Sequence, residues 1–150
     1  VVGLGSHPFG DLFTGTPPEL LYPFQVGLTP ERIALLPDPT LNLLAVFGLE
    51  LAAVWLGLLV AARLLDRSLR RYVEPHAVLG IGYGAAALVL PAPSLEVAAP
   101  FALSVVAVGG VGVFPLARRI DLETVSRGFV TGVTAVTLAG AGYTVAYLLV

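Results

Sequence analysis

Three polar side chains near the start of the chain have types and spacing that could hold a metal ion. His7 and Asp11 lie four residues apart, so on a helix they would share one face, and Thr14 would follow about one turn later. An imidazole and a carboxylate are ordinary ligands of zinc and similar divalent ions. Such an ion lowers the pKa of a bound water and makes it a nucleophile near neutral pH. The spacing therefore indicates a hydrolytic centre with His7 and Asp11 as metal ligands and Thr14 as a catalytic residue that holds a ligand or a water.

A structural interpretation of the same residues stays open beside the catalytic one. Pro8 follows His7 directly and pushes it out of helical geometry, so His7 could instead cap a short helix that ends before Pro17 and Pro18. His7 and Asp11 would then be interface residues. Two ligands by themselves do not complete a metal site.

The pattern around these residues continues along the chain. His7-x-x-x-Asp11-x-x-Thr14 is followed by residues 20–24 (LLYPF) and then by a series of apolar segments. Over roughly residues 5–24 this resembles the predicted membrane-bound metal-dependent hydrolases, a family of LexA-regulated inner-membrane proteins. In that family H-x-x-x-D-x-x-T precedes a leucine-rich stretch that ends in Pro-Phe. The resemblance implies metal-ligand roles for His7 and Asp11, with Thr14 and Pro23-Phe24 as accompanying motif positions.

Glu50 is the second position at which function could reside, because it falls near the middle of an apolar stretch. An ionised side chain at mid-membrane costs about 2.5 to 3.5 kcal/mol or more, so we expect Glu50 to face other helices. One hypothesis makes it a proton or ion relay. The other makes it a buried polar contact with a threonine of the last apolar segment: Thr131, Thr134 or Thr137.

The composition is that of a membrane protein. Of the 150 residues, 57% are hydrophobic and 12% are charged, whereas about a quarter of the residues of a soluble domain are charged. A soluble fold of this length could not bury so much apolar surface. The absence of cysteine excludes disulfides, thiolate metal sites and cysteine nucleophiles. The net charge of -2 and the lack of a basic, aromatic stripe argue against nucleic acid as a partner.

Four apolar segments approach or exceed the length needed to cross a bilayer core of roughly 30 Å. They cover residues 41–65, 77–91, 97–117 and 128–150, and the second is the shortest. We therefore predict an all-α, polytopic membrane protein with a four-helix transmembrane bundle over residues 41–150. Residues 1–40 would be a motif segment on the extracytoplasmic side, either interfacial or re-entrant. Glycines four apart, at 80 and 84 and at 128 and 132, predict close packing between helices.

The arginines predict the orientation of this bundle. The loops 63–76 and 118–127 hold every arginine except Arg32, whereas the link 91–96 has none. Short loops rich in arginine stay on the cytoplasmic side, so the first forty residues reach the membrane from outside. His76 then lies on the opposite side from His7 and is interpreted as an interfacial residue. The arginines near it are interpreted as a topology signal and a contact for lipid headgroups.

Together these features predict a cell-membrane hydrolase that uses a divalent ion, zinc or similar, against a lipid-like or phosphorylated substrate. Two alternatives remain. One is a small helical transporter or accessory membrane subunit with Glu50 as its working group, and the other is a purely structural membrane partner. The opening residues, Val1-Val2-Gly3, resemble the end of an apolar segment, and we expect further residues upstream of them.

Overall fold

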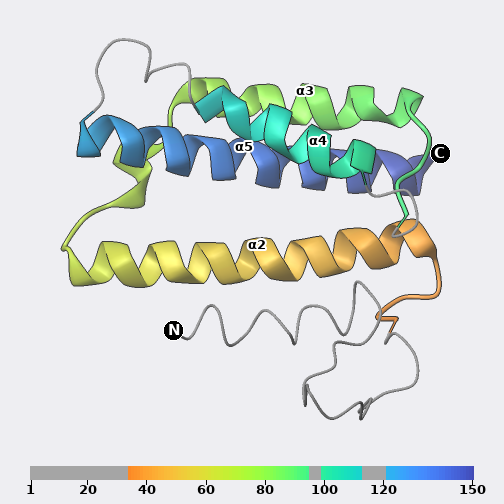
Figure 1. Ribbon diagram of the computed structural model, residues 1–150, viewed down its shortest axis with the longest axis horizontal. Helices are drawn as coiled ribbons and strands as arrows, with labels where there is room; N and C mark the ends of the chain where they lie inside the picture. Colours follow the sequence, from red (N-terminus) through yellow and green to blue (C-terminus); the bar gives the residue numbers. More distant parts are fainter. Residues whose placement is uncertain (1–33, 95–98, 113–120) are drawn as a thin grey trace, which may run out of the picture.

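Helices and their connecting turns make up all of the chain that the computed structural model describes, which is residues 34–94, 99–112 and 121–150 (Figure 1). The α-helices are α2 (Pro39–Leu64), α3 (Leu79–Ala86), α4 (Ala99–Gly109) and α5 (Leu122–Leu149). Short 3-10 helices accompany them: η1 (Leu69–Tyr72), η2 (Pro75–Val78) and η3 (Ala87–Val89). The predicted all-α class is confirmed over these residues, which contain no β-strand.

Local chemistry sets both ends of α2. Asp38 caps the helix by accepting a hydrogen bond from the Leu41 N–H at 2.7 Å, and Pro39 occupies the first helical position. At the other end Asp66 has a φ of 50°, a left-handed conformation more usual for glycine. The prediction that residues 41–65 form one long helix is therefore confirmed.

The last helix starts earlier than hydropathy predicts. Asp121 caps α5 by accepting from the Thr124 N–H at 2.6 Å, so the helix begins at Leu122 rather than at residue 128. Its first two turns are polar. A hydropathy pattern marks only the apolar part of a helix, so the predicted segment leaves out the polar turns. Consequently α5 is 28 residues long.

Two helices, α2 and α5, are long and apolar enough to cross a membrane. The other two apolar segments form shorter helices of 10–17 residues, Pro75–Val89 and Ala99–Gly112. At about 1.5 Å per residue such helices fall short of a core of roughly 30 Å. The segment predicted over 77–91 is mixed with 3-10 turns and ends before Pro91, and that over 97–117 is described only as far as residue 112. The structure thus supports two crossing helices by length and composition, rather than the predicted four.

The helix α5 is the centre of the packing. Figure 1 shows α2 on one side of it and α3 on the other, with α4 drawn in front of α5 and the long axes of α2 and α5 roughly parallel, and α5 contacts each of the other three helices. A Cβ atom on Gly80 or Gly84 of α3 would overlap the carbonyl oxygens of Ala135 and Ala139. The predicted role of the glycine pairs in close packing is confirmed here, and also at Gly132, which faces the end of α4.

The four helices give the described part of the chain two chemically different ends. We call the end at which α2 stops and α5 starts the arginine end, because Arg63, Arg67 and Arg127 lie there. We call the opposite end, at which α2 starts and α5 stops, the proline end. It includes the turn formed by residues 90–94.

Candidate functional site

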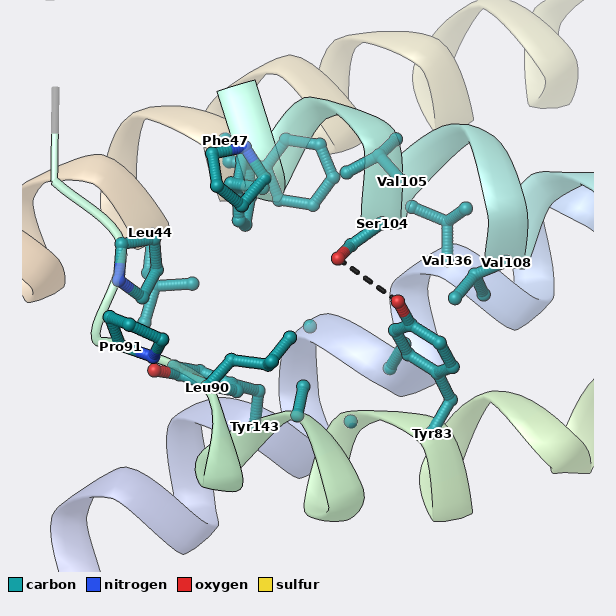
Figure 2. A pocket seen from close by; sticks show the side chains of 17 residues that line it. Leu44, Phe47, Tyr83, Leu90, Pro91, Ser104, Val105, Val108, Val136 and Tyr143 are labelled. Atoms are coloured by element: carbon teal, nitrogen blue, oxygen red, sulfur yellow. Dashed lines mark hydrogen bonds between the residues drawn. The ribbon is translucent and has the colours of Figure 1, made fainter. Parts of the chain in front are cut away.

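An apolar cavity of about 110 Å³ lies between α2, α3, α4 and α5 toward the proline end (Figure 2). Leu44 of α2, Val105 of α4 and Val136 of α5 contribute aliphatic walls, and Leu90 and Pro91 close the side next to the turn. The lining therefore comes from every α-helix described and from the turn that joins η3 to α4. The cavity therefore forms only when all four helices pack together.

Aromatic rings make up much of the remaining wall. Phe47 of α2 and Phe101 of α4 meet edge to face, with ring centroids 5.0 Å apart and an interplanar angle of 86°. This arrangement is the favoured geometry for an aromatic pair. Tyr143 of α5 is buried, at 8% exposure, and lines the cavity from the opposite side.

One hydrogen bond between side chains adds polarity to the cavity wall. The Tyr83 hydroxyl donates to Ser104 Oγ at 3.0 Å and joins α3 to α4, as the dashed line in Figure 2 shows. None of the residues that line the cavity is a carboxylate, an imidazole or a basic side chain. The cavity can therefore bind and orient an apolar group, whereas proton transfer would need residues from elsewhere.

Polar contacts secure the proline end beside the cavity. Thr40 Oγ1 donates to the Pro93 carbonyl at 2.8 Å, and this bond ties the start of α2 to the turn. Asn42 Oδ1 accepts from the N–H groups of Leu35 and Leu36 at 2.6 and 3.1 Å. Asn42 is only 2% exposed, and its Nδ2 has no hydrogen-bond partner among the described residues. Buried polar side chains thus fix the first turn of α2 against the residues that precede it and against the turn at Pro93.

A second apolar groove lies beside the cavity, between α2 and α5. It shares Leu44, Phe47 and Gly140 with the cavity and has a volume of about 460 Å³. The Trp55 indole N–H donates to Thr137 Oγ1 at 3.0 Å and spans the groove. Leu44 and Phe47 of α2 therefore border both spaces.

The predicted metal site lies outside the described residues. His7, Asp11 and Thr14 all belong to residues 1–33, so their assignment as metal ligands and catalytic residue stays a prediction. Among residues 34–94, 99–112 and 121–150, no group of three or more His, Asp or Glu side chains could hold a metal ion.

The prediction that Glu50 makes a buried contact is wrong. Glu50 is exposed on the surface of α2. Thr134 and Thr137, two of its expected partners, donate to carbonyls of their own helix at 2.7 and 2.8 Å. The cause is the rotation of α2, which turns Phe47 and Leu51 toward the core and leaves Glu50 to the side.

His76 lies at the arginine end, at the opposite end of the helices from the proline turn. Its Nε2 is 3.2 Å from the Val111 carbonyl oxygen, so it joins η2 to the end of α4. Beside it, Glu74 forms an ion pair with Arg127 at 3.2 Å. Within the described part of the chain, His76 therefore makes a structural contact between two elements.

Sequence analysis did not identify Tyr83, Ser104 or the Phe47–Phe101 pair. Tyr83 and Ser104 are 21 residues apart, and no spacing rule connects residues of two different helices. The only local signal is the proline-rich turn at Pro91 and Pro93, which brings α3 and α4 together as neighbours.

No protein-family description, no curated protein and no solved structure matches the chain. The resemblance to the hydrolase family remains a prediction from residues 5–24.

Proposed function

We propose that this chain is a multi-pass membrane protein that binds the apolar tail of a lipid-like substrate between α2, α3, α4 and α5. We further propose that residues 1–40 supply a metal-dependent hydrolytic centre that acts on this substrate. The observation that carries the proposal is the cavity itself. Its walls are aliphatic and aromatic, with one polar contact between Tyr83 and Ser104. A lining of this kind suits the end of an alkyl or isoprenoid chain, with few polar groups to orient it.

Exposed apolar surface supports a location in the membrane. Only 17% of the most apolar window of α2 is buried by protein. Leu49, Leu56 and Leu64 are 58%, 64% and 81% exposed. Surface of this extent on a soluble monomer would drive association, whereas in a bilayer it contacts lipid.

The charge distribution supports the orientation of the bundle. We propose that the loops 63–76 and 118–127 face the cytoplasm and that the proline end faces outward, because the arginines concentrate in these loops. In this arrangement α3 and α4, although short, lie in the membrane against α5 and complete a four-segment bundle. The glycine contacts of α3 with Ala135 and Ala139 support this position.

The hydrolytic part of the proposal depends on residues 1–40, which join α2 at the proline end. His7 and Asp11 would hold a divalent ion, zinc or similar, and Thr14 would hold a water or a substrate group. When bound, such an ion supplies an activated water near neutral pH. The cavity would hold the tail of the substrate on the same side of the membrane.

Tail binding can be tested with a cavity-filling variant and a matched control. Ala87 lines the cavity, whereas Ala85 of α3 is exposed and does not. The full chain in a neutral detergent would be incubated with palmitic acid or dipalmitoyl-phosphatidylglycerol, and retained ligand would be counted by native mass spectrometry. We expect Ala87→Phe to reduce retention about tenfold or more and Ala85→Phe to leave it unchanged. No retention by the wild type, or equal retention by both variants, would contradict the proposal.

The metal centre has a separate test. The metal content of the purified full chain would be measured for the wild type, His7→Ala and Asp11→Ala. We expect bound ion in the wild type and its loss in both variants. A wild type without metal, or variants that keep it, would remove the hydrolytic part and leave tail binding standing.

Glu50 favours a second candidate function, that of an accessory subunit or transporter component. An ionisable side chain inside a membrane normally faces protein or water, and Glu50 lies exposed between apolar residues such as Leu49 and Val54. A helix of another subunit would then cover this face of α2. Glu50→Gln should abolish proton uptake into reconstituted vesicles if Glu50 relays protons. If instead it only contacts a partner, Glu50→Gln should reduce the mass of the detergent-extracted complex.

A further inference from the structure

We infer that the cleft at the arginine end binds a phosphate-bearing anion. The cleft lies between the last turn of α2, η1 and the first turns of α5, and it has an open volume of about 710 Å³. Four arginines line it, Arg63, Arg67, Arg71 and Arg127, with Ser68 and Tyr72 between them. It is separate from the apolar cavity, which lies toward the proline end, and it takes no part in the proposed hydrolysis.

The end of α2 gathers these arginines. Because Asp66 has a left-handed conformation, the Arg67 N–H can donate to the Ala62 carbonyl at 2.8 Å. The Asp66 N–H donates to the Arg63 carbonyl at 3.3 Å. These two bonds form a Schellman motif, which stops the helix and reverses the chain. Arg63 from the last turn of α2 and Arg67 from beyond it therefore come to line the same cleft.

Among the described residues, positive charge exceeds negative charge in the lining of the cleft. Arg127 is paired with Glu74 at 3.2 Å and with Glu123 at 3.0 Å. Within the described residues, Arg63, Arg67 and Arg71 form no ion pair. The lining has four guanidinium groups and two carboxylates, Asp66 and Glu123, so its net charge is two positive charges.

The donors present match the acceptors of a phosphate group. Guanidinium groups bind phosphate oxygens through paired, charge-assisted hydrogen bonds, and several can share one tetrahedral anion. Arg67 Nη1 donates to the Tyr72 hydroxyl at 2.7 Å, and this bond holds the guanidinium at the cleft. The Tyr72 hydroxyl still has its own proton to donate. The anion can be the headgroup of an acidic phospholipid or a soluble phosphate, because both present the same oxygens.

The test uses the purified full chain in a neutral detergent. Binding would be measured for phosphatidic acid, phosphatidylcholine and inorganic phosphate at constant ionic strength, by native mass spectrometry for the lipids and by the thermal midpoint for phosphate. We expect phosphatidic acid to bind and phosphatidylcholine to bind at least about tenfold more weakly. Arg71→Gln should weaken phosphatidic acid binding about tenfold to a hundredfold.

Arg70→Gln is the matched control, since Arg70 is exposed in the same 3-10 helix and does not line the cleft. It removes the same charge and should change binding about twofold or less. Asp66→Asn gives a change in the opposite direction that misfolding cannot produce. It removes a repulsive carboxylate, Asn tolerates the left-handed conformation, and binding should tighten about two- to fivefold.

Each outcome decides the inference. Competition by inorganic phosphate would identify phosphate itself as a sufficient ligand, and phosphatidic acid binding without competition would identify the lipid as the source. The inference is overturned if neither binds, if phosphatidylcholine binds as well as phosphatidic acid, or if Arg70→Gln weakens binding as much as Arg71→Gln.

Discussion

At the scale of single residues, backbone atoms determine how closely the helices of this protein approach one another. A Cβ atom on Gly84 would overlap the Ala139 carbonyl oxygen and come 3.0 Å from the Tyr143 amide nitrogen. We expect Gly84→Ala to lower the free energy of unfolding by about 1–3 kcal/mol, because α3 and α5 must move apart. Thermal unfolding in detergent, followed by the fluorescence of Trp55, would measure the change.

Gly82 is the control for this substitution, since nothing lies within 4 Å of a Cβ atom built there. Gly82→Ala should leave stability unchanged or raise it by up to about 1 kcal/mol, through helix propensity. Equal losses for both variants would show that the glycines of α3 do not act by close packing.

Thr131 gives a second prediction at this scale, because its hydroxyl serves two backbone groups at once. It is fully buried, accepts from the Glu74 N–H at 3.1 Å and donates to the Tyr72 carbonyl at 3.0 Å. Thr131→Val should cost about 1–3 kcal/mol, since both groups lose their partner. Thr134→Val, which removes only a bond to its own helix, should cost less than half as much in the same unfolding measurement. Equal costs would exclude this bridging role.

At the scale of elements, two aspartates define where the long helices stop and start. Asp66 ends α2 with a φ of 50°. Asp66→Gly should raise the free energy of unfolding by about 1 kcal/mol, because glycine adopts this conformation without a steric cost. Asp66→Val should lower it by about 1–2 kcal/mol, and Asp66→Asn should resemble the wild type. Thermal midpoints that do not follow this order would show that the motif does not control the end of the helix.

Asp121 makes the start of α5 sensitive to acid. The hydrogen bond from the Thr124 backbone N–H holds the pKa of this carboxyl below its usual value. A lowered pKa in the folded state means that the stabilisation is complete above the unfolded value of about 3.9 and is lost as the pH falls through the folded value.

The variant Asp121→Asn cannot ionise and serves as the comparison. We expect the difference in thermal midpoint between wild type and variant to be constant above about pH 5 and to shrink below about pH 4. A difference that stays constant down to about pH 2 would contradict the assignment of this acid dependence to Asp121.

At the scale of the whole molecule, the proposed membrane bundle predicts which connections share a side of the membrane. The chain contains no cysteine, so single cysteines can be introduced without background. Ser68→Cys at the arginine end should react with an impermeant maleimide only after cells are opened. Ser94→Cys at the proline end should react in intact cells. The same accessibility at both positions would exclude the bundle proposed here.

The sequence alone determined the features that depend on neighbouring residues. The apolar runs predicted an all-helical chain, and the glycine spacing predicted close packing at Gly80 and Gly84. Each of these follows from contacts within a few residues, which spacing along the chain expresses directly.

Only the tertiary structure decided the rotation of α2, the short lengths of α3 and α4, the apolar cavity and the arginine cleft. The cavity requires Tyr83 to meet Ser104, and the cleft requires Arg63 to lie near Arg127. Such contacts between helices depend on the rotation and the axial position of each helix. Packing across the whole bundle determines both. For this reason Glu50, expected inside, lies outside: the packing of Phe47 and Leu51 against the core sets the rotation of the helix that carries all three.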